Sequence, residues 1–173
     1  SPQTATELDR NPEGRQFLEA ILPHAERAAN TLGVPVEQVL AQAVLETGWG
    51  KSVIKNMDGS SSYNLFGIKA DNRWQGASVS TTTQEFYGSK ALQVNASFRS
   101  YESLEQSFDD YVDFLTVNPR YSAVHNAAGE FAQVLQQAGY ATDPEYANKI
   151  EQIGKQLGAS ISEPATSISS EGV

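Results

Sequence analysis

The chain of 173 residues has no cysteine, only two histidines and a single methionine. Without cysteine, disulfides, thiol catalysis and Cys-ligated zinc sites are excluded. The two histidines, His24 and His125, are far apart in the sequence and have no spacing typical of metal ligands. We therefore expect neither a metal site nor a cofactor, and acid–base chemistry is left to carboxylates and tyrosines.

Basic residues are also scarce. Twelve Lys and Arg stand against 21 Asp and Glu, which gives a formal net charge of −9. Because binding to phosphate groups needs a basic surface, this balance disfavours nucleic acid and anionic membranes as partners. No apolar run approaches the length of a membrane span, so no membrane insertion is expected.

Hydrophobic periodicity predicts a mostly helical α+β domain. Helices are expected from Pro12 to Leu32 (with a kink or a break at Pro23), from Pro35 to Thr47, over 103–117, around 131–135 and over 144–157. Residues 77–87 and 92–98 are typical of two strands joined by a turn at Gly88. We expect a loose segment at 1–10, one domain at 11–158 and a disordered tail at 159–173, which has no aromatic residue and no periodicity.

Glu46 is the first candidate for acid–base chemistry. It falls in the last turn of the most hydrophobic predicted helix, between Leu45 and Trp49. The negative end of the helix dipole and the apolar neighbours both disfavour the charged form, so its pKa should rise. A carboxyl group that stays protonated near neutral pH suits a general acid. A surface glutamate in an unfavourable position would give the same pattern.

Glu85 lies in the predicted hairpin. If the hairpin folds back over the end of the helix that carries Glu46, the two carboxyl groups face each other across a groove. Such a pair of carboxyl groups is what glycoside hydrolysis commonly uses. A solubilising residue on an exposed hairpin is the alternative interpretation.

Aromatic residues crowd the same loops and helix ends, and sugar rings stack on aromatic faces. Core packing is the alternative for these residues, and it is the expected role of Phe66. Asn64 could orient a sugar substituent or stabilise a turn. The candidate substrate-binding residues are Trp49, Tyr63, Asn64, Phe66, Trp74, Tyr121 and Tyr146.

Four segments, taken in order, resemble a known family: LAQAVLETGWG at 40–50, SYNLFGIK at 62–69, TTQEF at 82–86 and AGYATDPEYA at 138–147. The sequence is similar to the endo-β-N-acetylglucosaminidases of glycoside hydrolase family 73. Within that family it looks closest to the flagellar rod-assembly subgroup of proteobacteria, which NPRY at 118–121 also fits.

The resemblance implies a lysozyme-like fold with a substrate groove between a helical lobe and a β-hairpin lobe. It also implies hydrolysis of the β-1,4 bond between N-acetylglucosamine and N-acetylmuramic acid in peptidoglycan, in the periplasm. Glu46 matches the general acid, and Glu85 matches the hairpin carboxylate proposed as the second catalytic residue. The family's route is either inverting or substrate-assisted, and in the second route the substrate acetamide attacks its own anomeric carbon and Glu85 matters less. Tyr140 is the first choice for the functional tyrosine and Tyr146 the second. Flagellar rod proteins are implied as partners through an N-terminal region absent from this chain.

Two other functions fit the same residues. A lytic transglycosylase of the same broad fold also uses one glutamate at a helix end, but it cleaves at muramic acid and forms an anhydro product. A binding module would hold the glycan without cutting it.

Overall fold

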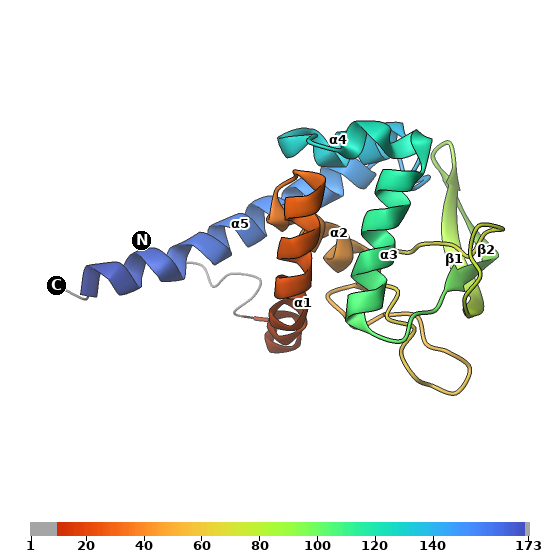
Figure 1. Cartoon of the computed structure of the whole chain (residues 1–173), viewed down its shortest axis with the longest axis horizontal. Helices are drawn as coiled ribbons and strands as arrows, with labels where there is room; N and C mark the ends of the chain where they lie inside the picture. The colour runs from red at the N-terminus through yellow and green to blue at the C-terminus, as the bar shows by residue number, and fades with distance from the viewer. Residues whose placement is uncertain (1–9, 172–173) are drawn as a thin grey trace.

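The computed structural model describes the backbone of residues 10–171 and the side chains of residues 10–158. Two helices, α1 (Pro12–Leu32) and α2 (Val36–Thr47), precede a hairpin of β1 (Ser78–Tyr87) and β2 (Lys90–Arg99). Three more helices follow: α3 (Leu104–Val117), α4 (Phe131–Gln137) and α5 (Tyr146–Glu171), with short 3₁₀ turns at Pro119–Val124 and Ala128–Glu130. The order confirms the predicted α+β fold, with the hairpin at one end of a helical body (Figure 1).

Helix α1 begins where the sequence predicts, because the Asn11 side chain accepts a hydrogen bond from the backbone N–H of Gly14 at 2.9 Å. Of the two alternatives at Pro23, the division into two helices was wrong, since α1 is one helix across Pro23. Proline removes one backbone hydrogen bond. Ile21 and Ala25, on either side of it, remain buried in the core and hold the helix together.

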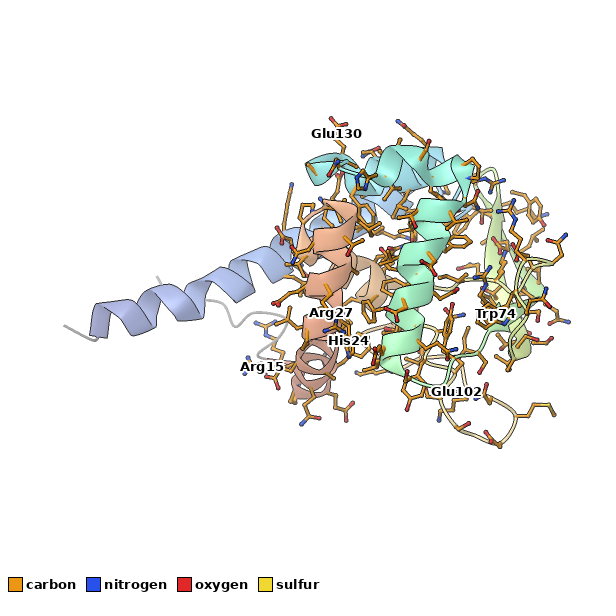
Figure 2. All side chains as sticks on the ribbon, in the orientation of Figure 1. Arg15, His24, Arg27, Trp74, Glu102 and Glu130 are labelled. Atoms are coloured by element: carbon orange, nitrogen blue, oxygen red, sulfur yellow. The ribbon has the colours of Figure 1, made fainter. Side chains whose placement is uncertain are left out.

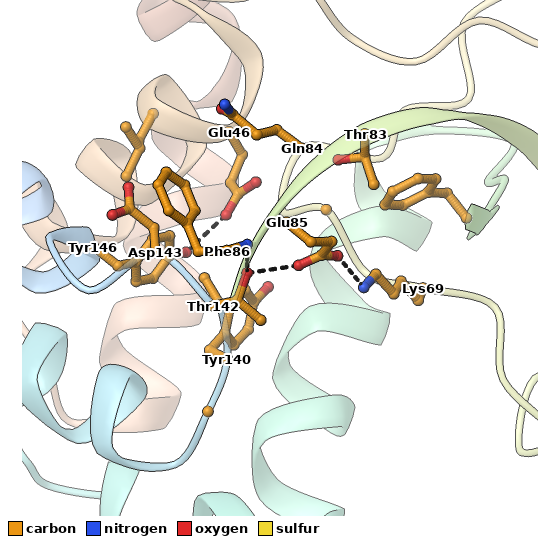
Figure 3. A pocket seen from close by; sticks show the side chains of 15 residues that line it. Glu46, Lys69, Thr83, Gln84, Glu85, Phe86, Tyr140, Thr142, Asp143 and Tyr146 are labelled. Carbon is orange, nitrogen blue, oxygen red and sulfur yellow. Dashed lines mark hydrogen bonds and ion pairs between the residues drawn. The ribbon is translucent and has the colours of Figure 1, made fainter. Parts of the chain in front are cut away.

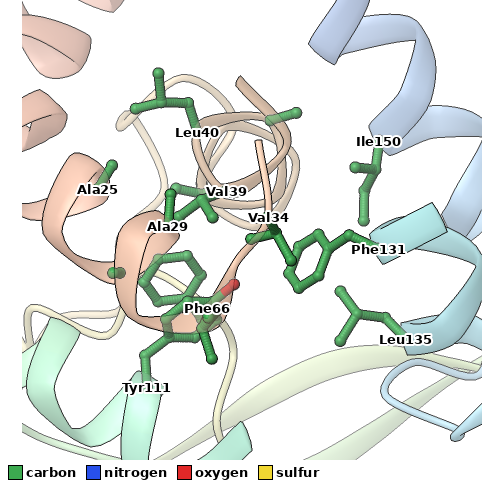
Figure 4. Packing of buried hydrophobic residues seen from close by; sticks show 14 of the residues in the cluster. Ala25, Ala29, Val34, Val39, Leu40, Phe66, Tyr111, Phe131, Leu135 and Ile150 are labelled. Carbon is green, nitrogen blue, oxygen red and sulfur yellow. The ribbon is translucent and has the colours of Figure 1, made fainter. Parts of the chain in front are cut away.

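Helix α2 is the centre of the fold and packs against both α1 and α5. Its apolar residues lie on more than one side: Val39 and Leu40 are buried (Figure 4), and Ala43 is buried as well. The helix ends at Gly48, whose φ of 56° is the left-handed conformation that glycine adopts most easily. Glu46 therefore lies in the last turn of a rigid, enclosed helix, as predicted.

The loop between α2 and the hairpin is packed rather than loose. Phe66 is fully buried and stacks on Tyr111 of α3, with ring centroids 3.7 Å apart (Figure 4). Further along the loop, Lys69 pairs with Phe98 of β2 in an isolated antiparallel bridge. The bridge places Gly67 and Lys69 beside the hairpin.

Arg99 anchors the base of the hairpin. It is only 5% exposed, and its Nη1 donates to both carboxylate oxygens of Asp110 on α3, at 2.9 and 3.2 Å. Its Nε donates to the carbonyl oxygen of Lys69 at 3.1 Å. Because these charge-assisted bonds link one buried guanidinium to α3 and to the loop at Lys69, β2 has a defined position relative to α3.

Helix α5 differs from the expectation at its C-terminal end. The sequence predicts a stop at Gly158 and a disordered tail at 159–173, whereas the backbone is helical to Glu171. A glycine inside a helix costs only about 1 kcal/mol, which does not by itself end the helix. This part of α5 projects from the body on the side opposite the hairpin (Figure 1). Residues 172–173 and all but the last of the expected loose segment 1–10 lie outside the described residues.

None of the helices in the described part of the chain combines the length and apolar character that a membrane span requires.

Candidate active site

A groove of about 420 Å³ lies between the end of α2 and the hairpin. The loop that carries Gly67 and Lys69 forms one part of its wall, and the loop between α4 and α5 forms another (Figure 3). The described residues that line it are Leu45, Glu46, Gly67, Lys69, Thr83, Gln84, Glu85, Phe86, Phe98, Gly139, Tyr140, Ala141, Thr142, Asp143 and Tyr146. The structure thus brings together Glu46, Glu85, Tyr140 and Tyr146, four of the residues singled out in the sequence.

Glu46 is largely buried, and what remains accessible faces the groove. Its Oε1 accepts a hydrogen bond from the hydroxyl of Tyr146 at 2.8 Å (Figure 3). Its Oε2 lies close to Gly67, where an added Cβ atom would come within 2.8 Å of it. The two carboxyl oxygens therefore have different surroundings.

The pKa of Glu46 is raised from the usual 4.5 to about 7. Burial is the largest cause, and the negative charge of Glu85 adds to it, while the hydrogen bond from Tyr146 acts in the opposite direction. A carboxyl group with this pKa is protonated in a large fraction of the protein molecules at neutral pH. It can therefore donate a proton to a leaving group.

Stability should depend on pH through Glu46. Between pH 4.5 and about 7 the folded chain holds a proton on this residue that the unfolded chain has lost. Stability therefore falls as pH rises through this window, by up to about 3 kcal/mol. The Glu46→Gln variant has no carboxyl group to titrate at this position. In urea titrations, the difference in free energy of unfolding between the variant and wild type should therefore shift in favour of the variant from pH 5 to pH 8. A constant difference across that range would contradict the raised pKa.

Glu85, on β1, is held by both of its carboxylate oxygens. Oε1 forms an ion pair with Lys69, and Oε2 accepts a hydrogen bond from the Thr142 hydroxyl at 2.7 Å (Figure 3). Thr142 in turn accepts from the backbone N–H of Phe86 at 2.8 Å. Partial burial raises the pKa of Glu85, but the hydrogen bonds from Lys69 and Thr142 and the charge of Lys69 outweigh it, so the pKa lies below 4.5. Between the pKa of Glu85 and that of Glu46, Glu85 is therefore ionised while Glu46 is still largely protonated.

Thr142 offers a test of the role of Glu85. Thr142→Val removes a hydrogen bond that lowers the pKa of Glu85, so the acid limb of the pH–rate profile should move to higher pH. Thr82→Val is the matched control, because the Thr82 hydroxyl also makes a hydrogen bond on the hairpin, to Asn95 at 3.1 Å, without touching Glu85. An unmoved acid limb in Thr142→Val would remove ionised Glu85 from the mechanism.

The two candidate tyrosines have different partners. The hydroxyl of Tyr140 donates to the carbonyl oxygen of Phe66 at 2.6 Å, which commits its proton to the backbone. Tyr146 is only 3% exposed and donates to Glu46. Burial is the main cause that raises the pKa of both tyrosines, and the charge of Glu46 adds to it, so both keep their protons. The rings stack with centroids 5.9 Å apart.

Two of the residues expected to bind substrate have structural roles. Asn64 is 2% exposed, its Nδ2 donates to the carbonyl oxygens of Ile68 and Arg99, and its Oδ1 accepts from the N–H of Ile68. This supports the alternative in which Asn64 stabilises a turn. Phe66 lies in the core, as its expected packing role requires.

Of the other expected substrate contacts, Tyr146 lines the groove, whereas Trp49, Tyr63, Trp74 and Tyr121 are not among the described residues that do so. Trp49 is packed against the core, and Tyr63 is half-buried. Tyr121 is 3% exposed and lies beside Tyr140, with ring centroids 5.9 Å apart. Trp74 lies at the hairpin end of the molecule (Figure 2), where it contacts Tyr101 edge to face and Arg99 lies over its ring.

Sequence reasoning missed several groove residues, among them Gly67, Lys69 and Thr142. All three belong to the motifs quoted above, so the motifs pointed to the right segments without indicating these individual residues. Phe86 and Phe98 supply aromatic surface in the groove in place of the expected tryptophans.

Comparisons with known proteins agree with this geometry. The model of a family described as mannosyl-glycoprotein endo-beta-N-acetylglucosaminidase matches residues 22–159. The peptidoglycan hydrolase FlgJ of Pseudomonas aeruginosa is 54% identical over 145 residues, which cover 82% of this chain and 36% of that protein. The chain thus spans about a third of the length of this relative, and 46% of that of a FlgJ from Vibrio parahaemolyticus.

Solved structures show the same fold. A peptidoglycan hydrolase mutant from Sphingomonas sp. A1 matches with a TM-score of 0.78 and 43% identity, covering 84% of this chain and 99% of that one. The glycoside hydrolase domain of Salmonella typhimurium FlgJ matches with a TM-score of 0.71 and 41% identity, covering 91% of this chain and 96% of that one. With its paired carboxyl groups in a groove between helices and hairpin, the chain belongs to the glucosaminidase family, glycoside hydrolase family 73.

Proposed function

We propose that this chain hydrolyses the β-1,4 bond between N-acetylglucosamine and N-acetylmuramic acid in peptidoglycan, on the reducing side of N-acetylglucosamine. One observation carries the proposal: a groove in which a protonated Glu46 and an ionised Glu85 are present at the same pH. Most glycoside hydrolases use one protonated carboxyl group as the acid and one ionised carboxylate as the base or nucleophile.

In this mechanism Glu46 donates its proton to the glycosidic oxygen as the bond to the anomeric carbon breaks. Glu85 supplies the negative charge that faces the positive charge developing on the sugar ring. A water molecule completes the hydrolysis, because its oxygen bonds to the anomeric carbon and the proton that it releases replaces the one that Glu46 has given up. The Tyr140 oxygen, whose proton is committed to Phe66, remains free to accept a hydrogen bond from the substrate acetamide. Phe86 and Phe98 offer apolar surface to the sugar rings.

The chemical identity of the new chain ends tests this proposal. Purified peptidoglycan is digested, the products are reduced with borohydride, and the ends are identified by mass spectrometry. Reduced N-acetylglucosamine ends are expected. Reduced muramic acid ends or anhydro-muramic acid ends would instead indicate a muramidase or a lytic transglycosylase. Retention on peptidoglycan without any release of fragments would indicate a binding module.

The biological setting is a further part of the proposal. The motifs shared with the flagellar rod-assembly subgroup, and the similarity to FlgJ proteins, support action on the periplasmic cell wall where the flagellar rod passes through it. Contacts with rod proteins would belong to a region outside these 173 residues. A strain that carries Glu46→Gln should then lose motility while making a normal amount of the protein. Unchanged motility would separate the hydrolase from rod assembly.

A further inference from the structure

A chain of buried hydrogen bonds runs behind Glu46 and away from the groove. The Tyr111 hydroxyl donates to Oε1 of Gln42 at 2.6 Å, and Nε2 of Gln42 donates to the hydroxyl oxygen of Tyr146 at 2.9 Å. Tyr146 then donates to Oε1 of Glu46 at 2.8 Å. Gln42 and Tyr111 have no exposed surface and Tyr146 is only 3% exposed, so all three are shielded from water.

Every bond in this chain has the same direction, and Tyr111 sets it. Burial raises the pKa of Tyr111 well above its usual value, so its hydroxyl keeps a proton that needs an acceptor. The side-chain oxygen of Gln42 is the acceptor that the structure gives it. A flipped Gln42 amide would leave that proton unpartnered in the core, which is costly.

The direction decides where the proton of Glu46 lies. Because Tyr146 donates to Oε1, that oxygen is an acceptor and the acid proton belongs on Oε2, the oxygen beside Gly67 in the groove wall. With a flipped amide, Gln42 would accept the Tyr146 proton, and Glu46 would donate inward to Tyr146. The acid would then face the core rather than the substrate.

We propose that Gln42, held by Tyr111, is a positioning residue that directs the acid proton of Glu46 into the groove. It touches neither substrate nor reacting atoms and acts through Tyr146. The catalytic consequence rests on the proposed function. The direction of the buried hydrogen bonds does not depend on which substrate is bound.

Tyr111→Phe is the variant of choice, because it keeps the ring stacked on Phe66 and removes only the hydroxyl that fixes the amide. In a second variant, Gln42→Leu, the side chain cannot accept a proton, so Tyr146 keeps Glu46 as its acceptor and the pKa of Glu46 should move less. In Tyr111→Phe the amide is free to flip and to accept the Tyr146 proton, so Glu46 loses the hydrogen bond that lowers its pKa. We expect kcat to fall roughly 3- to 10-fold, and the alkaline limb of the pH–rate profile to move up by roughly 0.5–1 pH unit.

Two comparisons separate positioning from a general loss of packing. Tyr101→Phe is the matched control, since Tyr101 is a buried tyrosine whose hydroxyl donates to Asp110 and takes no part in the hydrogen bonds that lead to Glu46. Its alkaline limb should stay in place. In a Tyr146→Phe background, Tyr111→Phe should produce no further shift, because the link to Glu46 is already cut.

A direct titration keeps this inference separate from the proposed function. The Glu46 carboxyl carbon is followed by NMR against pH in wild type, Tyr111→Phe and Tyr101→Phe, without substrate. A rise in the Glu46 pKa in Tyr111→Phe alone is expected. Identical titrations in all three proteins would overturn the role of Gln42, whereas an inactive wild type with the expected titrations would overturn only the hydrolase.

Discussion

Glu46→Gln is expected to lower kcat on peptidoglycan by roughly 10²- to 10⁴-fold, the contribution typical of a positioned general acid. The amide has nearly the shape of the protonated carboxyl, and its oxygen can still accept the hydrogen bond from Tyr146. It cannot, however, give a proton to the leaving sugar. Release of soluble fragments from purified peptidoglycan, measured at pH 6, gives the rate.

The matched control is Glu19→Gln, which makes the same chemical change on an exposed position of α1. It should retain the wild-type rate. Circular dichroism and thermal unfolding should show that Glu46→Gln is folded at least as well as wild type at neutral pH. Turnover of Glu46→Gln within a few-fold of wild type would reject Glu46 as the acid.

Gly67→Ala should lower activity by roughly 10²-fold, since a misplacement of about 1 Å at a catalytic group costs that much. The new methyl group would lie 2.8 Å from Oε2 of Glu46, so the carboxyl must move away from it. That oxygen is the end of a flexible side chain, so its displacement should lower the catalytic rate more than it lowers the free energy of unfolding. Alanine at the φ of 64° found for Gly67 adds about 1–2 kcal/mol of backbone strain.

Gly88→Ala separates the two effects. Gly88, in the hairpin turn, has nearly the same φ, 65°, but an added Cβ would have no neighbour within 4 Å. Both variants should therefore lose a similar amount of stability in urea titrations, and only Gly67→Ala should lose most of its activity. Equal activity losses in the two would mean that strain alone is responsible and that Glu46 does not need the space beside Gly67.

Local sequence patterns predicted the parts of the molecule that local physics determines. Helix α2 with Glu46 in its last turn followed from apolar periodicity and from Gly48, and the hairpin followed from alternation around Gly88. The raised pKa of Glu46 followed from its apolar setting, and burial is indeed the main cause. These features depend on residues that are close together in the sequence.

Contacts between distant residues were beyond reach from the sequence alone. Tyr146 meets Glu46 across a separation of 100 residues, and nothing near either residue indicates the other. The motifs placed Tyr146 in the site without giving it a partner, and Gln42 received no role at all. The residue type also does not tell whether an aromatic side chain packs in the core or lines the groove, because Phe66 does the first and Phe86 the second. Which residue lies inside depends on the tertiary packing.

Helix α5 begins with Tyr146, the residue that donates to Glu46, so the acid is completed from the last helix of the described chain. A chain cut just before Tyr146 still contains Glu46 and Glu85, yet it lacks the hydroxyl that orients Glu46. It also loses the helix that covers α2. Completion of the core around α2 and completion of the acid are therefore tied to the same segment of the polypeptide.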